Sequence, residues 1–183
     1  TCIKASGKSL DHIQDEADER RVPEYSFDYC FPGDELGYQW TVIVGRERLS
    51  KTWMAAAVPK KGYVEGRYAT DKILQFIHDN GDTDNRIIIK SDNENAIQYV
   101  IKEVVAARQK DKTELRPQTL VESCVEKDSQ SDGLAEAAVK DAEGVIRRLL
   151  LNMEAKMETQ IDVRERIIAF MPEYAAYLMN RLR

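Results

Sequence analysis

The sequence has no long apolar run and few cysteines. None of its apolar stretches approaches the roughly 18 residues that a membrane-spanning helix needs, and no apolar segment follows a basic N-terminus. We therefore expect neither a membrane span nor a signal peptide. The three cysteines, Cys2, Cys30 and Cys124, lie far apart and form no C-x-x-C pair. An odd number of isolated cysteines argues against a disulfide framework and indicates a reducing compartment.

A basic excess is also missing. The 183 residues include 27 Lys and Arg against 32 Asp and Glu, which gives a net charge of −5. This balance argues against a dedicated nucleic-acid module, whose binding depends on positive charge, so any nucleic-acid contact must be local. Hydrophobic residues make up 43% of the chain, which is enough for the sizeable core of one soluble globular domain.

The composition changes at Val22. Residues 1–21 are rich in Asp, Glu, Lys, Ser and Gly and contain hardly any adjacent apolar residues, which is typical of a linker. From Val22 onward, apolar residues recur with the periods of strands and helices. We therefore predict a linker over 1–21 and one globular domain over 22–183.

The first part of this domain is predicted to be a β-meander. Glu24–Phe31 alternates aromatic and smaller residues, with Asp28 in its middle, and ends at a Pro-Gly-Asp turn. Tyr38–Gly45 and Lys51–Val58 are two further runs of the strand type. Short turns separate the three runs, so we expect three antiparallel strands.

Helical and strand patterns alternate in the rest of the domain. The predicted elements are a helix over Val64–Asn80, a strand over Arg86–Lys90, a helix built on Ile97–Val105, a strand over Leu115–Glu122, a loop over Lys127–Gly133, a helix over Leu134–Met157 and a last helix over about Ile161–Asn180 that Pro172 kinks or restarts. Pro117 places the second of these strands at a sheet edge. A meander followed by alternating helices and strands predicts an α/β fold with a mixed sheet covered by helices.

Three acidic residues occupy positions where a carboxylate is an unusual structural choice. Asp28 lies inside a strand, Asp92 follows the apolar strand at the edge where α/β folds bind ligands, and Glu136 lies in the first turn of the long helix. If the two strands are neighbours, the aspartates can converge while the helix brings Glu136 across from them. Such hard oxygen ligands bind Mg²⁺ or Mn²⁺, and paired ions can activate a nucleophile and stabilise the leaving oxygen of a phosphodiester.

Each acid also has an ordinary structural interpretation. Asp92, followed by Asn93 and Glu94, is a good helix N-cap. Glu136 can complement the dipole at the start of its helix, and Asp28 can pair with an arginine or face solvent. Spacing alone does not decide between these interpretations and a metal site.

Three segments in a fixed order carry a resemblance to a known family. They are Phe27-Asp28-Tyr29, Lys90-Ser91-Asp92-Asn93-Glu94 and Ser129-Gln130-Ser131-Asp132-Gly133-Leu134-Ala135-Glu136. Together with the order of strands and helices, they resemble the catalytic core of retroviral and retrotransposon integrases, the acidic-triad members of the ribonuclease H-like superfamily. The resemblance covers roughly residues 22 to 180. It implies a ribonuclease H-like mixed sheet of five strands, with an antiparallel meander and parallel strands, flanked by helices.

The resemblance also implies a site and a reaction. Asp28, Asp92 and Glu136 would be catalytic and would hold two Mg²⁺ or Mn²⁺ ions, with Asn93 and Glu94 supporting them from outside. The implied activity is that of a DNA integrase, a polynucleotidyl transferase of a retroelement that processes 3′ ends and transfers strands. The implied partners are the DNA ends of the element, target DNA and further copies of the chain in a homodimer or larger homo-oligomer. The implied location is the nucleus.

Basic residues near the predicted site are candidates for DNA contacts. Lys140 and Arg147 follow Glu136 on the same side of the long helix, and Lys60 and Lys61 lie in the turn after the third strand. Lys140 could equally form an i, i+4 ion pair with Glu136. The segment around Cys2 resembles the tail of the zinc-binding module that precedes integrase cores.

Two features of the sequence depart from the family pattern. Asp132 replaces the amide that usually precedes the glycine, and Glu143 stands where a second basic residue is expected. Both add negative charge beside the predicted site. They favour an alternative in which the chain is a catalytically inactive or domesticated integrase-like module for nucleic-acid binding or assembly. A hydrolytic nuclease of the same superfamily is a third interpretation.

Overall fold

The structure is a computed structural model of the 183-residue chain. It describes residues 22–33, 39–63, 65–109, 118–123, 129–162 and 164–182, with the backbone alone at 123 and 129–132. The predicted linker over 1–21 lies outside these ranges, as do Cys2 and Cys124, so the domain boundary stays a prediction. No helix within the described ranges is long and apolar enough to cross a membrane.

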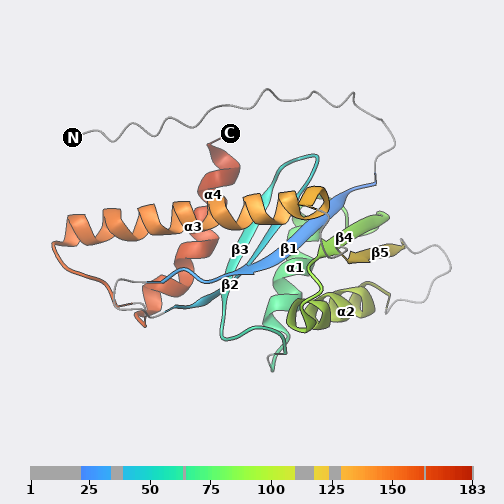
Figure 1. Ribbon diagram of the computed structural model, residues 1–183, viewed down its shortest axis with the longest axis horizontal. Helices are drawn as coiled ribbons and strands as arrows, with labels where there is room; N and C mark the ends of the chain where they lie inside the picture. Colours follow the sequence, from blue (N-terminus) through green and yellow to red (C-terminus); the bar gives the residue numbers. More distant parts are fainter. Residues whose placement is uncertain are drawn as a thin grey trace.

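The described strands form one mixed sheet of five strands in the order β3-β2-β1-β4-β5 (Figure 1). They are β1 Glu24–Cys30, β2 Thr41–Glu47, β3 Trp53–Val58, β4 Ile87–Ser91 and β5 Thr119–Ser123. β1, β2 and β3 form the antiparallel meander, whereas β4 is parallel to β1 and β5 is parallel to β4. The predicted mixed sheet is confirmed, and so is the position of β5 at its edge.

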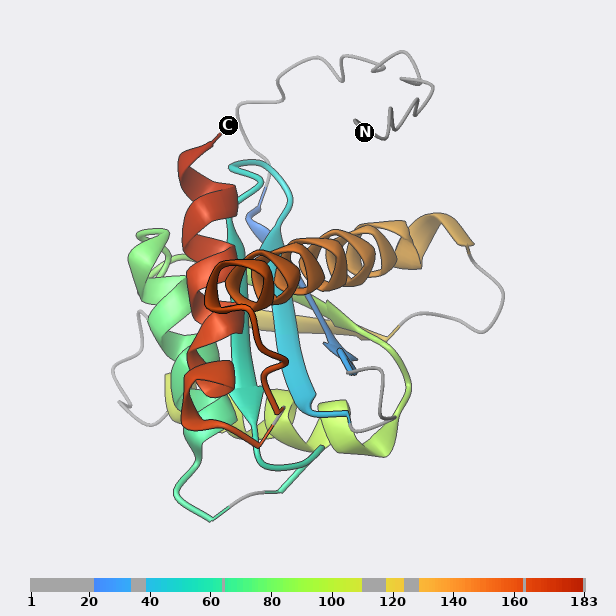
Figure 2. The ribbon, with the colours of Figure 1, turned by 90° about the vertical axis from the view of Figure 1, so that its left-hand side faces the viewer.

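Helices cover both faces of the sheet. They are α1 Tyr68–Asp79, α2 Asn95–Gln109, α3 Ser129–Met157, the 3₁₀ helix η1 Arg166–Phe170 and α4 Met171–Arg181. α1 and α2 pack on one face, and α3 and α4 pack on the other, so that the molecule has three layers (Figures 1 and 2). The sheet therefore lies between two helical layers, which cover its faces and not the ends of its strands.

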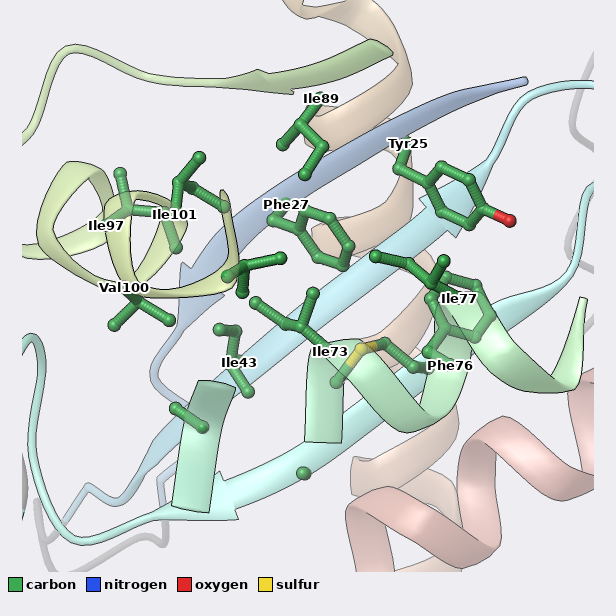
Figure 3. Close-up of a cluster of buried hydrophobic side chains, with 14 of the residues drawn as sticks. Tyr25, Phe27, Ile43, Ile73, Phe76, Ile77, Ile89, Ile97, Val100 and Ile101 are labelled. Atoms are coloured by element: carbon green, nitrogen blue, oxygen red, sulfur yellow. The ribbon is translucent and has the colours of Figure 1, made fainter. Parts of the chain in front are cut away.

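The central strand β1 is buried on both faces because its side chains alternate between the two helical layers. Tyr25, Phe27 and Tyr29 pack toward α1 and α2. There, the Tyr25 and Phe27 rings both meet the ring of Phe76 edge to face (Figure 3). Cys30 packs on the opposite face, with residues of α3. By the same alternation, Asp28 is directed to the α3 side of the sheet.

Gly45 of β2 makes room for the buried ring of Phe27. The two residues are paired across β1 and β2. A Cβ atom on Gly45 would lie 2.5 Å from Cε1 of Phe27 and 2.8 Å from Cγ of Met54. Phe27 is completely buried in a close-packed core, so its ring has little space into which it could move. Gly45 therefore leaves the space that the Phe27 ring occupies, next to Asp28 in β1.

Gly45→Ala is expected to lower the free energy of unfolding by about 1–3 kcal/mol, because the added methyl group overpacks a closed part of the core. Urea unfolding followed by circular dichroism measures the change. Gly133→Ala is the control, since Gly133 lies in α3 with nothing within 4 Å of an added Cβ. That variant should gain up to about 1 kcal/mol in helix propensity. Equal stability of Gly45→Ala and the unchanged protein would contradict this account of the Phe27 packing.

A buried polar network lies at the end of the sheet where β1 begins. Tyr25 Oη donates to Oδ2 of Asp82 at 2.5 Å. The Arg108 guanidinium donates to the carbonyl oxygens of Asp82 and Asn85. It also donates to Oγ1 of Thr119 in β5. Burial raises the pKa of Tyr25, and the hydrogen bond to Asp82 raises it further. The network ties α2, β5 and the turn before β4 to the start of β1.

The long helix begins earlier than predicted. α3 starts at Ser129, so the predicted loop over Lys127–Gly133 is wrong for residues 129–133, while 127 and 128 lie outside the described ranges. Ser and Asp are typical of turns, but the first turn of a helix tolerates them because its N–H groups lack partners within the helix, and Gly133 follows in the second turn. Glu136 consequently lies beyond the first turn, where the helix dipole has little effect.

Two other helix boundaries differ from the prediction. α1 begins at Tyr68 instead of residue 64, because Gly66 and Arg67 have φ values of 89° and 56°, which a right-handed helix excludes. The predicted last helix over Ile161–Asn180 is divided, since its first described residues are not helical and η1 and α4 follow. Pro172 lies at the start of α4, which confirms the predicted restart.

Candidate functional site

β1 and β4 come together at one edge of the sheet. They are parallel neighbours, and the last pair in their register is Phe27 with Ser91. Asp28 is the next residue of β1, and Asp92 is the first residue after β4. Because side chains alternate along a strand, Asp28 lies on the face opposite Phe27, which is the face that α3 covers. The structure therefore places two carboxylates at adjacent positions near the carboxyl ends of parallel strands.

The two aspartates have the same local hydrogen bond. Asp28 Oδ1 accepts the backbone N–H of Tyr29 at 2.7 Å, and Asp92 Oδ1 accepts the backbone N–H of Asn93 at 2.6 Å. Each carboxylate is thus oriented by the residue that follows it. Asp28 is partly buried, whereas Asp92 is exposed. The predicted role of Asn93 in supporting a metal site stays a prediction.

The structure argues against Asp92 as a helix N-cap. α2 starts at Asn95, and the carbonyl oxygen of Glu94 accepts a helical hydrogen bond from the N–H of Gln98 at 3.1 Å. The bond that the Asp92 carboxylate accepts comes from Asn93, which precedes the helix. Glu94 therefore occupies the N-cap position. This leaves Asp92 at the strand end, in the place where the metal-site interpretation needs it.

Gln98 holds the end of β4 in place. Its Nε2 donates to Oγ of buried Ser91 at 3.1 Å and to the carbonyl oxygen of Asp92 at 2.8 Å. One side chain from α2 thus fixes the backbone that carries Asp92. Gln98 is one of several polar residues of α2, and no local pattern in the sequence indicates its partners.

The third predicted acid, Glu136, is exposed on α3. A residue seven positions further along a helix lies on the same side, two turns on. That residue is Glu143, whose Oε1 accepts the backbone N–H of Phe31 at 3.4 Å, just beyond β1. The side of α3 that carries Glu136 therefore faces the end of β1. The sequence noted Glu143 only as a departure from the family pattern and missed this contact.

Cys30 lies within electrostatic reach of two of these acids. Burial raises the pKa of its thiol, and the Glu143 and Asp28 carboxylates raise it further. The thiol is therefore neutral and a poor nucleophile. Its role is to fill space between β1 and α3.

Among the described residues, no three His, Cys, Asp or Glu side chains are grouped so that they could hold a metal ion. The structure brings Asp28 and Asp92 to neighbouring positions and does not gather Glu136 with them, so the three-ligand assignment stays a prediction. The pair by itself suits Mg²⁺, which keeps several waters and usually binds one or two carboxylates together with substrate phosphates. The donor set therefore fits a magnesium ion shared between the protein and a phosphate-bearing ligand.

Lys61 and Glu94 bind each other. Lys61 Nζ donates to both carboxylate oxygens of Glu94 at 2.7 Å. The ammonium group also lies over the Phe31 ring, 4.7 Å from its centroid. The sequence assigned Lys61 to DNA and Glu94 to the support of the metal site, and it missed their ion pair because they lie far apart along the chain. The pair joins the loop after β3 to the loop after β4.

The loop after β3 is bonded to β1 as well. The Gly62 N–H donates to Oη of Tyr29 at 3.1 Å. Burial raises the pKa of Tyr29, the Gly62 N–H lowers it, and Glu94 and Asp28 raise it. The resulting direction is upward, so the hydroxyl group stays protonated near neutral pH. The ends of β1, β3 and β4 thus form one connected rim beside the two aspartates.

The other predicted DNA contacts are exposed. Lys60, Lys140 and Arg147 are all accessible to solvent. No ion pair joins Lys140 to Glu136, both of which the structure describes. Lys140 and Arg147 share the side of α3 that carries Glu136. These cations are therefore available to bind phosphates, and their role as DNA contacts stays a prediction.

Comparisons with known proteins show the fold of this chain. No protein-family model matches the chain, and no curated protein matches it. Solved structures do match, and they show that the chain has the ribonuclease H-like fold of retroviral integrase catalytic cores. The fold that the sequence resemblance implied is confirmed.

Three of the matching structures illustrate the similarity. The HTLV-2 integrase catalytic core domain in complex with magnesium, in its dimeric form, has a TM-score of 0.55 and 15% identity, over 88% of this chain and 90% of that chain. Its trimeric form has a TM-score of 0.52 and 14% identity, over 88% of each chain. The simian T-cell lymphotropic virus intasome in complex with the PP2A regulatory subunit B56 gamma has a TM-score of 0.54 and 15% identity, over 88% of this chain and 50% of that chain. At these identities the similarity shows the fold alone.

A double-mutant cycle on Lys61→Met and Glu94→Gln should give a favourable coupling energy of about 0.2–1 kcal/mol, because the two side chains are only about one-third exposed and make a two-point ion pair. Urea unfolding of the two single variants and the double variant measures it. Strictly additive effects would show that the ion pair does not stabilise the rim. Exposed Lys60→Met serves as the control and should leave stability within about 0.5 kcal/mol of the unchanged protein.

Proposed function

We propose that this chain is the catalytic core of a metal-dependent DNA integrase of a retroelement. The reaction would be polynucleotidyl transfer: water cleaves a phosphodiester near a DNA 3′ end, and the new 3′ hydroxyl then attacks target DNA. The observation that supports this most is the position of Asp28 and Asp92 near neighbouring ends of parallel strands. The fold is shared with a retroviral core that was solved in complex with magnesium.

The proposed cofactors are Mg²⁺ or Mn²⁺ ions, a pair of them, held by Asp28, Asp92 and Glu136. When bound, such ions supply an activated nucleophile at neutral pH and stabilise charge on the leaving oxygen. The chain would contribute two carboxylates already oriented by the N–H groups of Tyr29 and Asn93. Within the described ranges, Glu136 is not grouped with them. It would join them from α3 when metal and DNA are present.

The proposed substrates are the DNA ends of the element and target DNA. Lys140 and Arg147 on α3, and Lys60 after β3, are exposed cations that would contact phosphates. Lys61 would act indirectly, since its ammonium group is bound to Glu94. The net charge of −5 keeps this attraction local to the site. Binding should therefore weaken as salt rises, with a shallow slope.

We also infer that the chain works in the nucleus as a homodimer or larger oligomer. Four apolar or aromatic side chains of η1 and α4 are exposed, namely Ile167, Phe170, Tyr174 and Tyr177. An exposed apolar surface of this kind is typical of a protein–protein contact. The HTLV-2 core structures are described as dimeric and trimeric forms.

Asp28→Asn and Asp92→Asn should each lower DNA strand transfer by at least about 100-fold while the fold is retained, because either change removes a charged metal ligand. A strand-transfer assay with Mg²⁺ or Mn²⁺ measures the activity, and circular dichroism checks the fold. Asp84→Asn is the matched control, since Asp84 is an exposed aspartate before β4, at the opposite end of that strand. Full activity in either site variant would overturn the assignment.

Glu136→Gln should lower strand transfer to a similar extent, yet leave the Mn²⁺ affinity of the DNA-free protein unchanged, because Glu136 is not grouped with the aspartates. Asp92→Asn should weaken that affinity by roughly 10- to 100-fold. Isothermal titration calorimetry measures both. Glu143→Gln is the control and should keep its strand-transfer activity. If Glu143→Gln were inactive and Glu136→Gln active, the third ligand would be Glu143.

A second candidate function is that of a catalytically inactive binding or assembly module. It is favoured by the Glu143 carboxylate at the end of β1, where the family pattern has a basic residue, and by the lack of a three-acid group in the described part of the chain. Absence of any Mg²⁺ or Mn²⁺ binding would support this module. DNA cleavage without joined products would instead support a hydrolytic nuclease.

A further inference from the structure

Tyr63 and Tyr99 form an exposed aromatic pair. Tyr63 is 57% exposed and Tyr99 is 39% exposed. Their ring centroids are 5.6 Å apart, and the ring planes meet at 87°. In this edge-to-face arrangement one ring turns its edge to the other, so the ring that presents its edge keeps both of its faces uncovered by the partner. The pair therefore offers flat aromatic surface to solvent.

The pair lies at the same edge of the sheet as the two aspartates. β3 runs parallel to β1, because each is antiparallel to β2, so the loop after β3 that carries Tyr63 leaves from the edge where β1 and β4 end. Tyr99 lies in the second turn of α2, a helix that starts three residues after Asp92. Figures 1 and 2 show this loop beside α2. The aromatic pair thus flanks the candidate site.

The backbone around Tyr63 is firmly held. Gly62 has a φ of 74°, and a Cβ atom at this position would lie 3.4 Å from Cα of Ala96 in α2. The Gly62 N–H donates to Tyr29, and the Lys61–Glu94 ion pair anchors the preceding residue to the loop after β4. A pre-ordered aromatic surface loses little conformational entropy when it binds a ligand.

The charged side chains near the pair favour a ligand that combines neutral bases with phosphates. Tyr99 Oη donates to Oε1 of Glu103 at 3.3 Å, and Glu103 Oε2 accepts a hydrogen bond from Thr70. This carboxylate repels a phosphate, but it does not repel the face of a neutral base. Lys60, three residues before Tyr63 in the same loop, is an exposed cation. Aromatic rings beside a cation are the combination that single-stranded nucleic acids bind.

We propose that Tyr63 and Tyr99 stack on an unpaired nucleobase of the DNA strand whose backbone reaches Asp28 and Asp92, while Lys60 contacts a phosphate of the same strand. The inference rests on the proposed function and adds a base-binding surface to it. Because every base has an aromatic face, the surface tolerates any sequence. It would recognise a frayed or single-stranded DNA end in preference to a fully paired one.

The test is the affinity of the protein for a single-stranded oligonucleotide without divalent metal, measured by fluorescence anisotropy. Tyr63→Ala and Tyr99→Ala should weaken binding by roughly 5- to 100-fold, which corresponds to the loss of about 1–3 kcal/mol of stacking per base. Tyr63→Phe and Tyr99→Phe should restore it, because the ring is retained. Leu49→Ala, at a 51% exposed side chain in the turn between β2 and β3, is the control and should bind normally, because this turn lies at the opposite end of the strands.

An oligonucleotide of abasic residues separates stacking from other effects. It should bind the unchanged protein and the Ala variants equally, because it offers phosphates without bases. Equal loss of natural and abasic strands in the Ala variants would overturn the proposal, since the change would then be structural or electrostatic. Unaltered binding of the natural strand by both Ala variants would overturn it as well.

The outcome can be told apart from a failure of the proposed function. Asp28→Asn should not weaken binding of the single strand without metal, because the change removes a carboxylate that repels phosphate. Strand transfer that survives in Asp28→Asn, together with weak binding in Tyr63→Ala, would refute the integrase chemistry and support the base-binding surface. Strand transfer that depends on Asp28, together with normal binding in Tyr63→Ala and Tyr99→Ala, would refute the base-binding surface alone.

Discussion

Parallel pairing of β1 with β4 determines where the proposed site residues lie. The hydrogen bonds of this pair bring Phe27 into register with Ser91, and the aspartates that follow these residues meet at one sheet edge. A parallel pair needs a crossover connection, which β2, β3 and α1 provide here. The pairing in turn depends on packing, since β1 is buried on both faces and Gly45 gives Phe27 the space that it occupies.

The two ends of the strands in this sheet have different polar groups. At the start of β1, Arg108 and Asp82 form a closed network of buried hydrogen bonds that holds helix and strands together. At the other end, the polar groups bind loops to one another and leave carboxylates, cations and tyrosine rings facing outward. Lys61 with Glu94 joins two of these loops. Loops that are joined by ion pairs and hydrogen bonds can hold a charged ligand in one orientation without changing their own conformation.

Much of the fold could be predicted because its signals are local. The alternation in β1 and the apolar run of β4 identify the strands, and Pro172 identifies a helix start. The predicted start of α3 was wrong, since Ser and Asp have the same local preference for a turn and for the first turn of a helix. The links from Gln98 to Ser91 and from Lys61 to Glu94 escaped prediction because only the folded chain brings their partners together.

The sequence by itself determined the type and order of the elements, and it placed Asp28 inside one strand and Asp92 at the end of another. It could do so because hydrophobic periodicity depends only on residues that are close along the chain. Only the tertiary structure decided that these strands are parallel neighbours, that Glu143 reaches the end of β1 while Glu136 stays exposed, and that Tyr63 meets Tyr99. Those facts depend on how a helix lies across a sheet and how loops pack, which local patterns do not encode.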